Sequence, residues 1–132
     1  LMQKMKREHN VAFMYITHDL ATARYFAERT AVMYVGHMVE WGETEDIIKD
    51  PQHPYTQLLI SAVPDPLKRN KKENKPAHVK NQDIPIWTGS SVGCPFVGRC
   101  THEMDKCSKS MPAITKISEK HFVRCFLHGD SL

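Results

Sequence analysis

The stretch TAVMYVGHMVEW, residues 30–41, decides the fold of the central part of this 132-residue chain. Two apolar runs, 30–35 and 38–41, lie on either side of the pair Gly36-His37. Glycine readily adopts the left-handed conformations that tight turns require, so two short apolar runs around such a pair are typical of a β-hairpin. The sequence therefore predicts two paired strands here.

A third apolar run, Val11–Ile16, lies nearer the start of the chain and is followed by Thr17-His18-Asp19. A continuous apolar run bounded by polar residues is typical of a strand buried on both faces of a parallel sheet. Together with the helices expected around it, this run predicts an α/β fold. His18 would then lie at the carboxyl end of a strand, where α/β sheets present side chains to ligands.

Helices are predicted from capping residues and apolar spacing. Asp19 suits the N-cap of the second helix and Thr44 that of the third, while Pro54 suits the first position of the fourth. His53, directly before Pro54, is expected to help fix that turn. The predicted helical segments are residues 1–9, 20–28, 45–50 and 54–62.

All four cysteines of the chain lie in its last third, separated by five, six and seventeen residues. Thiolates bind soft metals, and four of them complete either a tetrahedral zinc site or an iron–sulfur cluster. The gaps lack the C-x2-C turns of most zinc sites, and long gaps suit a bulky cluster better than one small ion. Two disulfides or four free thiols remain as alternatives. The expected ligands are Cys94, Cys100, Cys107 and Cys125.

Composition excludes several classes of protein. The formal net charge is +3, which is too small to imply a global field for nucleic acid. No apolar run approaches about 18 residues, so no transmembrane helix is expected. The first residues are charged and are not followed by the apolar core of a signal peptide. The default compartment is therefore the cytosol, where disulfides are disfavoured.

Residues 67–82 are rich in lysine and have no apolar periodicity, which is typical of a solvated linker. This linker divides the chain into three expected parts. Residues 1–66 form an α/β region, and residues 83–132 form a loop-rich extension that contains the four cysteines. One short helix is expected in the extension, near Cys107.

Several segments in succession resemble one protein family. The segment YITHDL, residues 15–20, resembles the switch-histidine motif of ABC transporter ATPases, and residues 30–42 resemble the two strands that follow it. Residues 53–59, HPYTQLL, resemble the oligopeptide/dipeptide/nickel branch of that family. The cysteine segments at 93–96 and 99–100, GCPF and RC, resemble the C-terminal extension of the same branch. The resemblance covers nearly the whole chain.

The resemblance implies a role for each group of candidate residues. In that family ATP hydrolysis is coupled to transport, and His18 would be the switch histidine that contacts the γ-phosphate in the intact subunit. The four cysteines would bind a [4Fe–4S] cluster, with zinc as the alternative, while ATP and magnesium would bind only to the full-length subunit. The implied partners are a second ATPase subunit and transmembrane permease subunits at the cytoplasmic face of the membrane. No nucleic acid is expected.

Three motifs of the family are missing from the printed sequence: the phosphate loop G-x-x-x-x-G-K-[ST], the strand that ends in Asp-Glu, and the signature segment. Family order places them before Leu1, so we expect a C-terminal fragment of the P-loop ATPase domain that is inactive by itself. Its strand 11–16 would lack sheet neighbours, which predicts self-association. The alternative is a stand-alone iron–sulfur or zinc-binding interaction module. A weaker alternative is a nucleic-acid binder that uses the lysine-rich linker and a zinc site.

Overall fold

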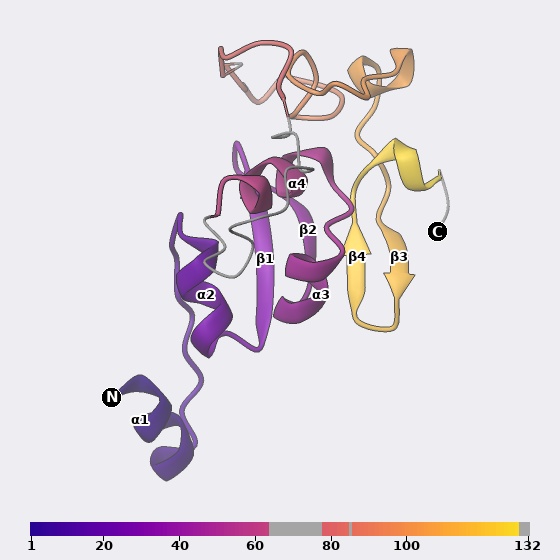
Figure 1. Ribbon diagram of the computed structural model, residues 1–132. Coiled ribbons are helices and arrows are strands. Elements are labelled where there is room, and N and C mark those ends of the chain that lie inside the picture. Colours follow the sequence, from indigo (N-terminus) through magenta and orange to yellow (C-terminus); the bar gives the residue numbers. More distant parts are fainter. Residues whose placement is uncertain (64–77, 85, 130–132) are drawn as a thin grey trace, which may run out of the picture.

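A four-stranded antiparallel sheet forms the centre of the molecule, with the strand order β1-β2-β4-β3 (Figure 1). The computed structural model describes residues 1–63, 78–84 and 86–129. The sheet and the helices around it make a small mixed α/β fold. The strands are β1 Arg29–Tyr34, β2 His37–Glu43, β3 Thr115–Ser118 and β4 His121–Val123.

The first hairpin, β1–β2, confirms the paired strands predicted from residues 30–41, but its turn is at Val35-Gly36 and not at Gly36-His37, because His37 already belongs to β2. Its turn residues Val35 and Gly36 have φ values of 47° and 78°, and Tyr34 pairs with His37 on either side of them. Positive φ at both central residues is the geometry that matches the twist of paired strands. Gly36 adopts this conformation readily, whereas the β-branched Val35 adopts it at a cost that the pairing of the two strands offsets.

The second hairpin, β3–β4, was not predicted, because residues 83–132 were expected to be loop-rich. β4 pairs with β2 through Glu40–Val123 and Trp41–Phe122, and the two aromatic rings of the latter pair stack with centroids 5.7 Å apart. These strands are only four and three residues long. Strands this short lack a clear alternating pattern, and the second neighbour of β4 is a strand about 80 residues earlier in the chain.

The helices follow the predicted segments closely. Asp19 is the N-cap of α2, and its Oδ1 accepts a hydrogen bond from the Ala21 N–H at 2.9 Å. The prediction that Thr44 caps α3 is wrong: Glu43 is the N-cap, and the Thr44 hydroxyl instead bonds to the Thr30 hydroxyl at 2.8 Å. The helices are α1 Met2–His9, α2 Leu20–Phe26, α3 Thr44–Lys49 and α4 Pro54–Ser61, with 3-10 turns at Asp105–Ser108 and Phe126–His128.

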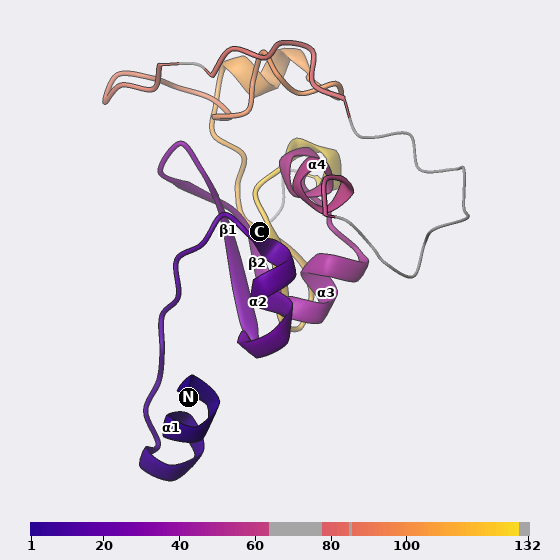
Figure 2. The ribbon, with the colours of Figure 1, turned by 60° about the vertical axis from the view of Figure 1, so that its left-hand side comes forward.

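The prediction of a buried parallel strand at Val11–Ile16 is wrong. These residues have no regular structure and are exposed, with Met14 and Ile16 at 92% and 90% of their full accessibility. A strand needs a neighbour for its backbone N–H and C=O groups, and no strand of the described residues pairs with this run. It extends from the sheet toward α1, which lies apart from the sheet in both views (Figures 1 and 2).

The core lies between the first hairpin, the helices and the loop that begins at Cys94. Figure 2 shows α2, α3 and α4 on the same side of β1 and β2, and α3 contacts both strands and α2. The cysteine-bearing loops lie at one end of the sheet, beyond α4 (Figures 1 and 2). The buried core residues are Val32, Tyr34, Val39, Ile47, Cys94 and Phe96.

Two sequence expectations concern residues with little or no described structure. Residues 64–77, most of the expected linker, lie outside the described residues, and residues 78–82 have no regular secondary structure. Within the described residues, no helix is long and apolar enough to cross a membrane. The short helix expected near Cys107 is confirmed by the 3-10 turn Asp105–Ser108.

Candidate functional site

All four cysteines line one small cavity between the beginning of α4, the loops over residues 94–112 and the turn after β4. The backbone brings two of them together directly, because the Cys94 N–H donates a hydrogen bond to the Cys107 carbonyl at 2.7 Å. Backbone N–H groups also reach two sulfurs: that of His102 bonds to Cys100 Sγ at 3.3 Å, and that of Met104 bonds to Cys107 Sγ at 3.4 Å. The four thiols therefore lie around one cavity, and their role as metal ligands stays a prediction.

The four thiols are free, so the disulfide alternative is not present in this structure. Burial raises the pKa of Cys94 to about 11 and that of Cys125 to about 12, and burial also raises the pKa of Cys100. Desolvation disfavours the charged thiolate, so these groups are protonated and weakly nucleophilic near neutral pH. Ligands of this kind bind a metal only when the metal displaces their protons.

The thiols share the cavity without converging on one point. Nowhere in residues 1–63, 78–84 and 86–129 do three His, Cys, Asp or Glu side chains come close enough to hold one metal ion. The arrangement therefore does not form a tetrahedral zinc site as it stands. What the structure shows is four thiols that line one cavity, which is a donor set of the right chemistry for a soft metal.

Gly93 allows the close approach of the two loops that hold Cys94 and Cys107. Its φ is +90°, and a Cβ there would lie 2.5 Å from the Cys107 carbonyl oxygen and 2.9 Å from the Ser108 carbonyl carbon. Both neighbours are backbone atoms, which cannot move aside as a flexible side chain can. Any side chain at residue 93 must therefore separate the loops.

Replacing Gly93 with alanine is expected to destabilise the protein more than replacing Gly98. Gly98 has a similar φ of +82° but open space around its Cβ position, so Gly98→Ala measures the backbone strain alone, about 1–2 kcal/mol. Gly93→Ala adds the collision with the Cys107 backbone. Urea unfolding midpoints and the alkylation rate of Cys107 measure the difference, and equal values for the two variants would contradict the close approach.

His53 is a second cavity residue, and it is the N-cap of α4. Its Nδ1 accepts a hydrogen bond from the Tyr55 N–H at 3.1 Å, which confirms that it fixes the turn before Pro54. Its ring is 1% exposed, and no described residue bonds to its Nε2. Burial lowers the pKa of His53 to about 4, and the nearby His128 lowers this pKa further. The ring is therefore neutral at physiological pH.

Glu40 positions the backbone at His53. It is fully buried on β2, and its carboxylate accepts hydrogen bonds from the N–H groups of Gln52 and His53, each at 2.8 Å. The same carboxylate lies 2.6 Å from His121 Nε2 on β4. This network was not predicted from the sequence. A glutamate in a short strand normally faces solvent, and the three partners of Glu40 are distant from it in the sequence.

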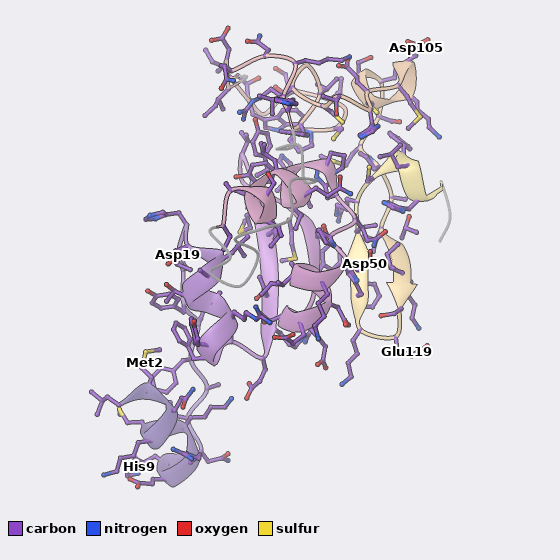
Figure 3. All side chains as sticks on the ribbon, in the orientation of Figure 1. Met2, His9, Asp19, Asp50, Asp105 and Glu119 are labelled. Atoms are coloured by element: carbon purple, nitrogen blue, oxygen red, sulfur yellow. The ribbon has the colours of Figure 1, made fainter. Side chains whose placement is uncertain are left out.

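His18 lies apart from the cysteine cavity, in the exposed segment before α2. Its neighbour Asp19 is at the start of that helix, whereas Asp105, two residues before Cys107, lies on the opposite side of the view (Figure 3). A hydrogen bond from Thr22 is the main cause of the lowered pKa of Asp19, and the charge of His18 contributes less. The structure thus brings the four cysteines together and leaves His18 at a separate place.

The chain belongs to the family described as "Oligopeptide/dipeptide transporter, C-terminal region", whose family model matches residues 39–107, more than half of the chain. The match includes the second strand of the first hairpin, α3, α4 and three of the cysteines. It confirms the resemblance to the oligopeptide/dipeptide branch of transporter ATPases.

The relatives have names that agree with this family. A putative oligopeptide transport ATP-binding protein of Bacillus subtilis, YkfD, is 33% identical over 99% of this chain and 40% of its own length. The oligopeptide transport ATP-binding protein OppF of Haemophilus influenzae is 34% identical, over 95% of this chain and 37% of its own length. AppF of Bacillus subtilis, with the same description, is 33% identical over 98% and 39%. The chain thus spans about two fifths of the relatives it matches, and it corresponds to the C-terminal region of such ATP-binding subunits.

Proposed function

We propose that this chain serves as the C-terminal region of the ATPase subunit of an ABC importer for oligopeptides, dipeptides or related solutes. The observation that supports this most is the similarity along nearly the whole chain to oligopeptide transport ATP-binding proteins. In the proposed importer this subunit works with a second ATPase subunit and with transmembrane permease subunits at the cytoplasmic face of the membrane. ATP and magnesium bind to parts of the subunit beyond the 132 residues, because these residues contain no phosphate loop.

His18 is the proposed switch histidine of the intact subunit. Its exposed position directly before α2 supports this role, because its imidazole is accessible to a ligand supplied by the rest of the subunit. Phosphoryl transfer to water is catalysed mainly by positioning and by stabilisation of charge. A neutral or protonated imidazole can donate a hydrogen bond to a phosphate oxygen near neutral pH.

The test compares the 132-residue chain with the full-length subunit in ATP hydrolysis. The chain alone is expected to hydrolyse no ATP, and His18→Ala in the full-length subunit is expected to lower kcat by about 10²–10³-fold, as the loss of one donor to transition-state charge does. His9→Ala, which changes an exposed histidine on α1, is the matched control and is expected to retain full activity. Hydrolysis by the chain alone, or full activity of His18→Ala, would overturn the assignment.

We also propose that the four cysteines bind a [4Fe–4S] cluster, with zinc as the alternative. The position of all four thiols around one cavity, and the N–H groups that bond to two of the sulfurs, support the cluster. Bound iron would join the loop over 94–107 to Cys125 after β4, so metal binding would stabilise the folded state. The role is structural, since the cavity is lined mainly by apolar residues and cysteines.

Anaerobic reconstitution with iron and sulfide tests this second proposal. The chain is expected to bind about four iron and four sulfide ions, and Cys125→Ser is expected to lose most of both. Ser108→Ala, an exposed change beside Cys107, is the control and is expected to retain them. One zinc ion without sulfide would favour the alternative, and binding of neither metal would overturn the site.

Two other readings of the sequence have less support. The family match favours part of an ATPase subunit over a stand-alone interaction module, and nothing in the described residues adds to the case for nucleic acid. Self-association of the 132-residue chain stays a prediction. The exposed apolar side chains of Val11–Ile16 support it, because they offer an unpaired surface to a second copy.

A further inference from the structure

Among the described residues, three buried side-chain atoms have no hydrogen-bond partner: His53 Nε2, Thr56 Oγ1 and Thr115 Oγ1. Of these three residues only His53 lines the cysteine cavity. A buried polar group without a partner costs free energy, so it is a candidate position for a bound partner. Of the three residues, His53 is the one that borders the space surrounded by the four thiols.

The hydrogen bonds of His53 determine which ring nitrogen has the proton. The Tyr55 backbone N–H can only donate, so Nδ1 must accept, and in a neutral imidazole the proton is then on Nε2. The low pKa described above keeps the ring in this neutral state. Nε2 is thus a hydrogen-bond donor at physiological pH.

The position of this donor is fixed from both sides. The backbone N–H of His53 is bonded to the buried carboxylate of Glu40, and its ring lies against Phe96 with centroids 5.9 Å apart. Phe96 is buried and lines the same cavity. A donor held by a helix N-cap, a carboxylate and an aromatic ring has little freedom to turn toward solvent.

We propose that His53 Nε2–H donates a hydrogen bond to a sulfur atom of the cluster held by the four cysteines, and that it raises the reduction potential of that cluster. The inference rests on the proposed cluster. Adding one electron to [4Fe–4S]²⁺ gives [4Fe–4S]⁺ and makes its sulfurs more negative, so a hydrogen bond to sulfur stabilises the reduced form more than the oxidised form. His53 is a positioning residue here, and no proton is transferred.

Two substitutions separate the donor from the helix cap. The side-chain oxygen of His53→Asn can still accept from the Tyr55 N–H, but its amide is too short to reach the place of Nε2. The amide nitrogen of His53→Gln can reach that place, but glutamine is a poor N-cap. The pair therefore distinguishes loss of the sulfur hydrogen bond from loss of the cap. His9→Asn, at an exposed histidine on α1 that does not line the cavity, is the control.

The experiment is a redox titration of the reconstituted chain, followed by electron paramagnetic resonance of the reduced cluster. His53→Asn is expected to disfavour reduction about tenfold, a shift of about 59 mV to lower potential for one electron. His53→Gln and the control His9→Asn are expected to retain the wild-type potential. Equal potentials for wild type and His53→Asn would overturn the inference, whereas a wild-type chain that binds no iron and sulfide would overturn the proposed cluster instead.

A second measurement on the wild-type chain keeps the inference testable if His53→Asn does not fold. With histidine that is labelled with ¹⁵N in the ring alone, electron–nuclear double resonance of the reduced cluster is expected to detect one ring nitrogen and its exchangeable proton, beside the backbone N–H protons of His102 and Met104. The His9→Asn chain is expected to retain the ring nitrogen and its proton. Their absence from a wild-type chain that contains the cluster would overturn the hydrogen bond.

Discussion

Glu40→Ala is expected to lower the free energy of unfolding by about 3–5 kcal/mol, the cost of removing one partner from a buried charged network. The carboxylate is fully buried and accepts from two backbone N–H groups, and it lies 2.6 Å from His121 Nε2. Alanine leaves the buried His53 N–H and His121 ring without this partner and also removes the half-buried bond to Gln52, and each unsatisfied group adds to the loss. Urea unfolding followed by circular dichroism measures the effect.

Two further variants test whether the network is the cause. Glu43→Ala removes a half-exposed carboxylate from the same strand, where it pairs with Lys120, and is expected to shift the unfolding midpoint much less, because a surface ion pair contributes little to stability. Glu40→Ala and His121→Ala are expected to be non-additive, because both remove the same contact. If Glu40→Ala and Glu43→Ala unfold at the same urea concentration, the network contributes nothing to stability.

Phe96→Ala is also expected to cost about 3–5 kcal/mol, the range for removing a buried aromatic side chain and leaving a cavity. The Phe96 ring is 2% exposed, and its centroid lies 5.2 Å from that of Tyr34 and 5.5 Å from that of Tyr55. These two tyrosines belong to β1 and α4, so one side chain joins the cysteine loop to both. Removing the Phe96 ring should therefore also loosen the attachment of the cysteine loop to β1 and α4.

Thermal or urea unfolding measures the stability change, and the alkylation rate of Cys94 reports on the loop. Phe96→Leu is expected to lose less stability, because leucine fills part of the space. Phe13→Ala, at a ring that is 44% exposed, is the control and is expected to change neither measurement. Alkylation of Cys94 at the wild-type rate in Phe96→Ala would show that the loop is held by other contacts.

The accuracy of the sequence predictions depended on the range of the interactions. The first hairpin and α2 were predicted well, because a turn glycine and a capping aspartate act on residues next to them. The run Val11–Ile16 was misread because its apolar pattern describes a preference for burial but does not supply a neighbouring strand. β4 was missed for the same reason, since its partner β2 is far away in sequence.

The predictions for the candidate site divide in the same way: local features were predicted, and features that depend on distant segments were not. Its four cysteines were found from the sequence, because cysteine is a rare residue with few roles and all of them lie in one part of the chain. The residues that support them were not found. Glu40 has no sequence signal that distinguishes it from an exposed glutamate, and His53 was noted only for the turn before Pro54.

By itself, the amino-acid sequence determined the local elements: the turn at Gly36, the caps and ends of the helices, the thiol chemistry and the resemblance to transporter ATPases. Only the tertiary structure decided that β4 joins β2, that Glu40 becomes a buried acceptor, and that His53 lines the cavity of the four thiols with its Nε2 bonded to no described residue. The physical reason is that propensities and caps act over a few residues. Burial and hydrogen-bond satisfaction instead depend on which distant segments meet, and no short stretch of sequence contains that information.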